Sequence, residues 1–155
     1  MRTTDSVTPE EKERNKELIS RFPFLMPRHV WTDTLLEDYD YEFTLMDDIP
    51  YGWRVAFGEQ MCQEIMDELV ASHYADAYRV VQIKEKYGGL RWYDNGAPTR
   101  LAREILPKYE DLSEHTCIHC GKPAKYVSRG WILPFCEDCI KLEQLDVDEY
   151  DVIDW

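Results

Sequence analysis

The chain has 155 residues, of which 44% are hydrophobic and 13% aromatic, so it is long enough and apolar enough to bury a real core. Its formal net charge is −13, with 31 acidic residues against 18 lysines and arginines, which disfavours nonspecific binding to nucleic acid or to an anionic membrane. No run of about eighteen apolar residues and no apolar signal segment is present, so we expect a cytoplasmic protein without a transmembrane helix.

The first predicted element is a helix over residues 8–20. Thr8 is a suitable N-cap, a proline follows at the first helical position, and Glu11 completes a capping box three residues on. The helix is mostly polar until Leu18 and Ile19, so we expect it to pack on the rest of the protein only near its end.

An acidic and aromatic segment follows. Residues 29–53 contain seven acids and no lysine or arginine, interleaved with Trp31, Tyr39, Tyr41 and Phe43. The alternation over the last three rings is strand spacing, which predicts an extended segment with one packed face and one solvated face. The functional alternative is a surface for a basic partner protein. We assign to that surface the acids Asp38, Asp40, Glu42, Asp47 and Asp48.

The clearest helix covers residues 51–72. Large apolar residues recur at every fourth position and form one wide stripe, namely Trp53, Phe57, Met61, Ile65 and Leu69. We predict that this stripe is core and packs on the hairpin that follows. Cys62 lies at the edge of the stripe and is predicted to be a small buried hydrophobe.

A hairpin and a further helix are predicted next. Residues 78–83 form one strand and residues 90–93 the other, and residues 84–89 lead the first strand into the turn between them. Gly88-Gly89 is a weak match to a phosphate loop, because neither a helix nor a Lys-Ser/Thr pair follows at once. A helix is then expected over residues 98–106, where Pro107 starts a new turn or kinks the chain.

Four cysteines near the C-terminal end form the strongest motif. They stand as Cys117-x2-Cys120 and, fifteen residues later, Cys136-x2-Cys139. Each short gap lets two sulfurs face one point, and two such pairs supply four thiolates for one tetrahedral Zn²⁺. A closed site of this kind has no open coordination position, so the zinc would be structural. The alternative is reduced cysteines without metal, or a redox pair.

The residues around the cysteines favour a zinc ribbon over residues 114–141. Gly121 suits the left-handed turn of a knuckle, and strand formers on either side of Arg129-Gly130 predict a two-residue hairpin. His119 lies within the first pair, where a surface or supporting role is favoured over a role as ligand.

The last segment, residues 142–155, alternates acids with apolar residues. Such a pattern is typical of a disordered segment that docks on a partner. Alternatively, Ile153 and Trp155 fold back on the protein. The sequence leaves both possibilities open.

These elements predict an α+β fold, with helices packed on a small antiparallel sheet or hairpin and a C-terminal zinc ribbon. The predicted boundaries are an acidic α+β domain over 1–113, the ribbon over 114–141 and an acidic-hydrophobic tail over 142–155. Acids exceed bases by 17 to 7 before residue 79 and by 6 to none after residue 141, whereas the middle has 8 acids and 11 bases. The ribbon is therefore mildly basic by sequence.

No catalytic motif accompanies these elements. The four histidines lie in no hydrolase or metalloprotease pattern, there is no GxSxG or HExxH, and no pair of carboxylates is singled out. We therefore expect that the protein is not an enzyme.

Three blocks together resemble a family of small proteins encoded in phages and prophages of gut bacteria. They are residues 49–58, residues 81–96 and the cysteine ribbon that ends at Pro134-Phe135-Cys136. The resemblance covers about residues 22–141 and implies a mobile-element setting in a bacterial host cell. It implies no particular activity, but small acidic phage proteins without catalytic motifs often bind host proteins, including defence nucleases.

Two functional hypotheses follow. In the first, a non-catalytic phage accessory protein uses its acidic ends to occupy the nucleic-acid channel of a basic host protein, such as a CRISPR effector nuclease. In the alternative, a ribbon protein binds nucleic acid through bases and stacking rings. Those residues are Lys84, Lys86, Arg91, Lys122, Lys125 and Arg129, with Tyr87, Trp92 and Trp131. The net charge favours the first, and a purely structural zinc protein is a third possibility.

Overall fold

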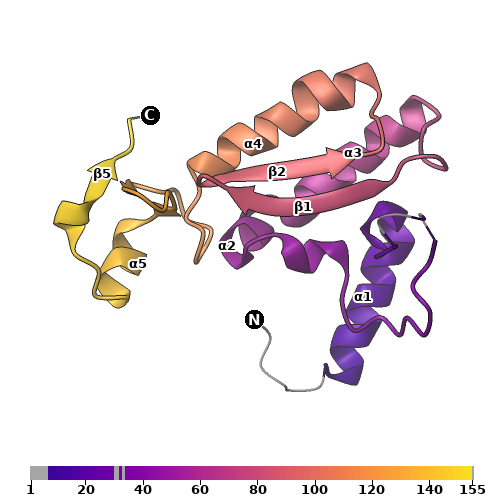
Figure 1. Ribbon diagram of the computed structural model, residues 1–155, viewed down its shortest axis with the longest axis horizontal. Coiled ribbons are helices and arrows are strands. Elements are labelled where there is room, and N and C mark those ends of the chain that lie inside the picture. Colours follow the sequence, from indigo (N-terminus) through magenta and orange to yellow (C-terminus); the bar gives the residue numbers. More distant parts are fainter. Residues whose placement is uncertain (1–6, 30–31, 33, 155) are drawn as a thin grey trace.

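The structure is a computed structural model that describes residues 7–29, 32 and 34–154, so Trp31 and Trp155 lie outside the described residues. It confirms the α+β class, with helices and two small antiparallel sheets. A larger body holds the first sheet, and the cysteine-containing region forms a smaller unit at one end (Figure 1). Within the described ranges, no helix combines the length and the apolar character that a membrane crossing requires.

Helix α1 (Pro9–Arg21) begins with the predicted capping box. The Thr8 hydroxyl accepts a hydrogen bond from the Glu11 amide, and the Glu11 carboxylate accepts one from the Thr8 amide. Leu18 and Ile19 are buried near the end of the helix, as predicted, but Asn15 is buried too and its amide donates to the Tyr41 carbonyl at 2.7 Å, so the helix also packs before its last turn. The chain then enters the core through the short 3-10 helix η1 (Pro23–Leu25).

The acidic segment is not the extended strand that the alternation predicted. Asp38 and Tyr41 have positive φ angles of 56° and 64°, which break an extended chain. The Tyr39 ring instead packs on Tyr41 at 5.0 Å and on Phe43 at 5.8 Å between ring centroids. The alternating rings therefore form a local aromatic cluster. The next element along the chain is the 3-10 helix η2 (Leu45–Asp48).

The predicted long helix is continuous, as α2 (Tyr51–Trp53), the π-helical turn η3 (Arg54–Gly58) and α3 (Glu59–Ala71). All five stripe residues are buried, and so is Cys62. They share one core cluster with Ile83, Leu90 and Trp92 of the hairpin, and the Phe57 ring also packs on Tyr109, 5.6 Å away.

Strands β1 (Val80–Lys86) and β2 (Gly89–Asp94) form the predicted hairpin, and its turn lies within the stretch predicted for it. Tyr87 and Gly88 occupy it with φ angles of 54° and 78°. Positive φ at both central positions is the type I′ conformation, which matches the twist of the flanking strands, and Gly89 pairs with Lys86 as the first residue of the second strand.

The following helix runs further than predicted, because Pro107 does not end it. Residues 99–100 are helical, the π-helical segment η4 (Leu101–Ile105) follows, and α4 (Leu106–Glu114) completes the helix. The Leu106 amide bonds to the carbonyl of Leu101, five residues back. The wide turn places Pro107 at the start of α4, where its missing N–H costs little.

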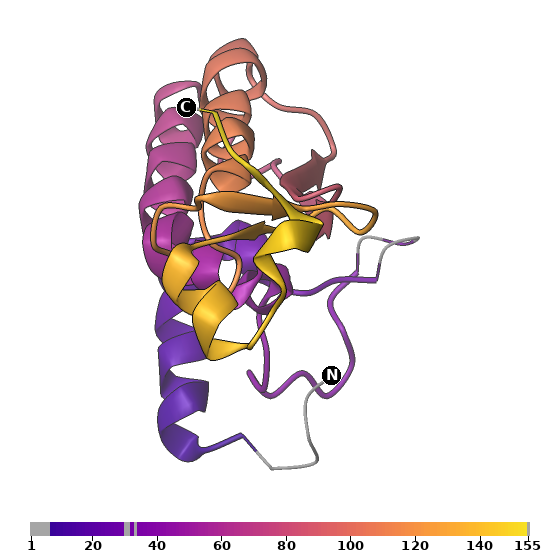
Figure 2. The same ribbon diagram turned by 90° about the vertical axis from the view of Figure 1, so that its left-hand side faces the viewer.

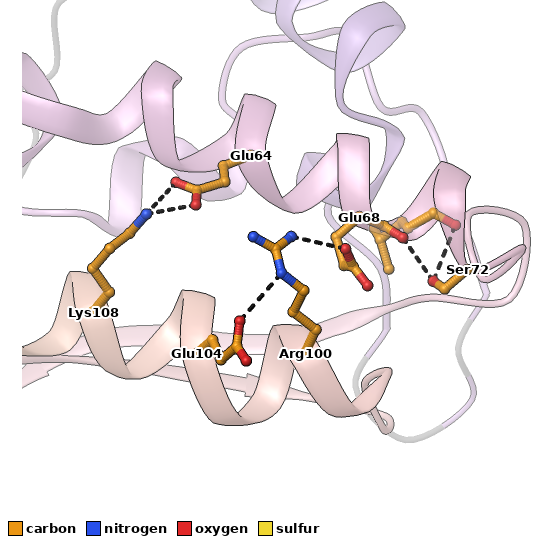
Figure 3. Close-up of polar contacts among 7 residues, drawn as sticks. Glu64, Glu68, Ser72, Arg100, Glu104 and Lys108 are labelled. Atoms are coloured by element: carbon orange, nitrogen blue, oxygen red, sulfur yellow. Dashed lines mark hydrogen bonds and ion pairs between the residues drawn. The ribbon is translucent and has the colours of Figure 1, made fainter.

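Helices α3 and α4 lie side by side (Figures 1 and 2), and polar side chains join them (Figure 3). Lys108 Nζ lies 2.7 Å from Glu64 Oε2, the Tyr109 hydroxyl donates to the same oxygen at 2.6 Å, and Arg100 pairs with Glu68 at 3.0 Å. The hydrogen bonds from Lys108 and Tyr109 lower the pKa of Glu64.

The C-terminal unit contains β3 (Tyr126–Ser128), β4 (Pro134–Phe135), α5 (Glu137–Leu142), η5 (Val147–Glu149) and β5 (Tyr150–Val152). Its strands are antiparallel in the order β4-β3-β5.

The predicted Arg129-Gly130 two-residue turn is wrong. Residues 129–133 form a longer loop, and the Ser128 hydroxyl closes it by accepting a hydrogen bond from the Leu133 amide at 2.8 Å. The second strand therefore begins at Pro134.

The tail folds back as far as it is described. Strand β5 pairs with β3 from Tyr150 to Val152, and the Ile153 amide bonds to the Lys125 carbonyl at 2.9 Å. Part of the tail is therefore a strand of the ribbon sheet, and its Asp151 lies beside Arg129.

Candidate functional site

The four cysteines of the two CxxC motifs come together in the C-terminal unit. Their Sγ atoms all lie within 4.8 Å of one another, and Cys120 Sγ is 3.5 Å from Cys136 Sγ. A tetrahedral ion with Zn–S bonds of about 2.3 Å places its sulfurs about 3.8 Å apart. None of the cysteines forms a disulfide. The donor set and its spacing therefore fit one tetrahedral metal ion.

The first pair sits on a tight knuckle. The Cys117 amide bonds to the Lys122 carbonyl at 2.8 Å, and the Gly121 amide bonds to the Cys117 carbonyl at 3.0 Å. Gly121 has a φ of 85°, the left-handed conformation that its position after Cys120 predicted.

The second pair lies at the junction of β4 and α5. Cys136 caps that helix, and its sulfur accepts a hydrogen bond from the Cys139 amide at 3.3 Å. The Ile118 amide donates to the Pro134 carbonyl at 3.0 Å. This hydrogen bond joins the first knuckle to β4, the strand that directly precedes the second pair.

The thiols influence one another's ionisation. Burial and hydrogen bonds with the neighbouring sulfurs raise the pKa of Cys136 and of Cys139. Burial also opposes ionisation of Cys117, but hydrogen bonds to the backbone of the two knuckles outweigh it and lower the pKa of that thiol. Four thiolates in one small volume repel each other, so a divalent cation is the natural counterion for this set.

His119 is not one of the grouped ligands. Its ring stacks on Phe135 with centroids 5.4 Å apart, and its Nδ1 lies 3.9 Å from a Glu143 oxygen. Half of its side chain is exposed, which agrees with the predicted surface role.

The knuckle docks on the start of the long helix, a contact that the sequence analysis did not find. The Gly52 amide donates to the Ile118 carbonyl at 2.9 Å, and Trp53 Nε1 donates to the Thr116 carbonyl at 3.0 Å. A Cβ atom on Gly52 would lie 2.1 Å from the Cys117 carbonyl oxygen. The only signal in the sequence was a glycine at the start of a strong helix.

The five acids assigned to a partner surface have unequal roles. Asp47 is half-buried: one oxygen pairs with Arg54 at 2.7 Å, and the other accepts the Thr44 amide at 2.9 Å. Asp47 therefore stabilises η2 and the helix that follows. The exposed members are Asp38, Asp40, Glu42 and Asp48. Of these, Asp40 pairs with Lys12 at 3.2 Å, and partial burial together with Asp47 raises the pKa of Asp48.

Three of the six basic residues of the nucleic-acid hypothesis form ion pairs. Lys122 pairs with Asp138 at 3.0 Å, Lys125 with Glu137 at 3.6 Å and Arg129 with Asp151 at 2.9 Å. Among the described residues, no ion pair forms at the other three, which are Lys84, Lys86 and Arg91.

The stacking rings of that hypothesis also differ in accessibility. Trp92 is buried, and its indole N–H donates to the Tyr78 hydroxyl at 2.8 Å. Tyr87 and Trp131 are 69% and 77% exposed. A Cβ atom on Gly88 would lie 3.0 Å from Ile132, so the two turns that carry these exposed rings are neighbours.

The returning tail reverses the charge of the ribbon. Residues 114–155 contain nine acids and only four lysines or arginines. All four bases stand within ion-pair distance of a carboxylate, since Lys141 lies 3.6 Å from Glu137 and the other three pair as described above. The ribbon with its tail is therefore acidic, although residues 79–141 alone are basic.

The chain was also compared with known proteins: it matches no model of a protein family, no curated protein and no solved structure. The resemblance to phage-encoded proteins therefore rests on the three sequence blocks alone.

Proposed function

We propose that this chain is a non-catalytic, zinc-stabilised accessory protein that acts by binding a basic protein. The observation that carries the proposal is the charge of the folded ribbon, whose four lysines and arginines are all paired while acids remain in excess. Such a surface attracts a basic partner and repels the phosphates of nucleic acid.

Zinc is the metal that best suits the four-cysteine centre. Thiolate ligands select soft or borderline metals, and four of them in a tetrahedral arrangement are typical of structural zinc. Because four sulfurs complete the coordination, a bound water has no place on the ion, and the metal serves folding. Removing it would leave the knuckles without their cross-link.

The partner that we propose is a host nucleic-acid-binding protein, such as a CRISPR effector nuclease of the bacterium that carries the phage or prophage. Two features support this class: the excess acid of the tail and the exposed acids Asp38, Asp40, Glu42 and Asp48. Carboxylates presented along a surface compete with phosphate for a basic channel, since both meet the same lysines and arginines. The family resemblance supplies the mobile-element setting.

The experiment is capture of host proteins on the immobilised chain, with and without nuclease treatment of the lysate. A captured protein is then purified and its affinity measured against salt. We expect capture to survive nuclease treatment and affinity to fall steeply as salt rises, because exposed charges are screened.

Variants identify the surface. Neutralising Asp38, Asp40, Glu42 and Asp48 together, with Asp47 kept for its structural bonds, should weaken binding and leave the fold intact. The matched change is Lys84→Ala with Lys86→Ala, which should leave binding unchanged. If the lysine variant abolishes binding and the acidic variant does nothing, or if nuclease treatment releases the captured protein, the nucleic-acid hypothesis replaces this one.

A further inference from the structure

A groove of about 370 Å³ opens on the C-terminal unit, and the described residues that line it come from three separate stretches of chain. The first knuckle contributes His119, the loop between β3 and β4 contributes Trp131, β4 contributes Phe135, and the folded tail contributes Tyr150. The groove therefore exists only when the tail has returned to pair with β3.

The lining is aromatic and ordered by mutual contacts. Phe135 is buried, the His119 ring stacks on it at 5.4 Å, and the Tyr150 ring meets it edge-on at 5.8 Å and 86°. The Ser128 hydroxyl donates to the Trp131 carbonyl and so holds the loop that carries the exposed indole. A large exposed ring on a braced loop beside a groove is a feature that core packing does not explain.

The charge around these rings is negative. Glu143 and Glu149 line the groove together with Arg129, whose guanidinium is neutralised by Asp151 at 2.9 Å. Within the described part of the chain, Glu149 forms no ion pair. A ligand that enters the groove thus meets aromatic π faces and the carboxylates of Glu143 and Glu149.

We infer that this groove receives a lysine or arginine side chain from a basic polypeptide. Cations are attracted to the faces of tryptophan, tyrosine and phenylalanine, and carboxylates at the rim add a Coulombic contribution. The volume lies at the lower end of the range for ligand pockets, which suits one or two long side chains. This inference rests on the proposed function and names the place where the basic partner inserts.

The probe is a fluorescein-labelled nona-arginine peptide, and the matched probe is the same peptide with citrulline, which keeps the shape and removes the charge. Fluorescence anisotropy measures both affinities. We expect the wild-type chain to bind nona-arginine and not the citrulline peptide. Trp131→Leu should lower the affinity by about five- to thirtyfold, since it keeps an apolar group and removes the π face. Trp131→Phe should retain most of the affinity.

Two further variants sharpen the assignment. Glu149→Gln should lower affinity by roughly two- to fivefold, because it removes an exposed charge at the rim. Tyr74→Leu removes another exposed ring, in the turn between α3 and β1, which Figure 1 places at the other end of the molecule from the ribbon. It should leave affinity unchanged. Trp131 is mostly exposed, so its variants should retain the metal and the fold.

The outcomes separate this inference from the proposed function. If Trp131→Leu binds nona-arginine as the wild type does while neutralisation of the four exposed acids abolishes binding, the groove is not the site and the proposed function stands. The groove is also excluded if the wild-type chain binds both peptides equally or neither of them. Failure of the proposed function appears separately, as the absence of any nuclease-resistant basic partner.

Discussion

The body and the ribbon of this protein are held together by different means. The core of the body contains large side chains removed from solvent, among them Trp53, Tyr78 and Tyr109. The buried cluster of the ribbon has six residues, and three of these are cysteines of the candidate metal site. Burial of apolar area stabilises the first region, whereas the second buries little of it and would depend on a metal held by its four cysteines. We therefore expect the core of the body to be stable by itself and the ribbon to need an ion.

The two regions meet at a close backbone contact rather than at a flexible linker. Gly52 of α2 donates to Ile118 of the first knuckle, and the Trp53 indole donates to Thr116. The end of α4 and the turn of the β1–β2 hairpin also point toward the ribbon (Figure 1). Loss of the metal should therefore destabilise the start of the long helix but not the rest of the body.

The largest expected effect is loss of the metal centre. Cys136→Ser should remove metal binding and unfold the ribbon, because structural zinc supplies on the order of 10–16 kcal/mol apparent in zinc-finger peptides. Hydrogen exchange should show lost protection over residues 117–153 and at Gly52, while α4 stays protected. Elemental analysis should find one zinc per chain in the wild type.

Cys62→Ala is the matched control for that experiment. Cys62 is buried in α3, and its burial raises the pKa of its thiol to about 12, so it stays protonated and is no ligand. The variant should keep its zinc. A wild-type ribbon that remains protected after the metal is stripped would contradict the contrast between the two regions.

The next effect concerns the core of the body. Phe57→Ala should cost about 3–5 kcal/mol of unfolding free energy, since the ring is buried against Tyr109 and leaves a cavity. Urea denaturation measures the loss. Val70 is 57% exposed and lies on the same long helix, so Val70→Ala should cost less than about 1 kcal/mol. Equal losses would mean that the stripe is not the core.

The contact between the two regions can be tested with a pair of helical glycines. Gly52→Ala should cost about 2–3 kcal/mol or more, because the new Cβ would stand 2.1 Å from the backbone oxygen of Cys117. Gly58→Ala meets only the flexible Met46 side chain at 3.1 Å and should be nearly neutral, helped by a helix propensity gain of about 1 kcal/mol. Thermal unfolding distinguishes them, and similar melting temperatures would show that the ribbon moves freely on the body.

The smallest effect is electrostatic and lies within the body. Hydrogen bonds from Lys108 and Tyr109 lower the pKa of Glu64 below its ordinary value of 4.5. The stabilisation is therefore complete above that value and disappears as pH falls through the lower pKa of the folded state. Glu64→Gln should cost about 1 kcal/mol near neutral pH.

Denaturation at several pH values checks this. The difference between wild type and Glu64→Gln should shrink as the solution becomes strongly acidic. Glu104→Gln, at the more exposed partner of Arg100, should cost only about 0.3–0.5 kcal/mol. A pH-independent difference at Glu64 would show that the side chain contributes packing and not charge.

Local patterns in the sequence were sufficient for several elements of this protein. The capping box at Thr8, the four-residue stripe from Trp53 to Leu69 and the two CxxC pairs each depend on residues a few positions apart. Helix periodicity and ligand spacing are short-range properties, so a sequence reveals them directly. The sequence was therefore enough to predict which four cysteines come together.

Tertiary structure decided what depends on residues far apart. Pro107 continues its helix because a wide turn precedes it, and the tail is a strand because β3 offers it a free edge. That pairing brings Asp151 to Arg129, adds the acids of the tail to the ribbon and completes the aromatic groove around Trp131. Charge neutralisation and groove formation depend on which side chains meet in space, and a linear pattern does not contain that information.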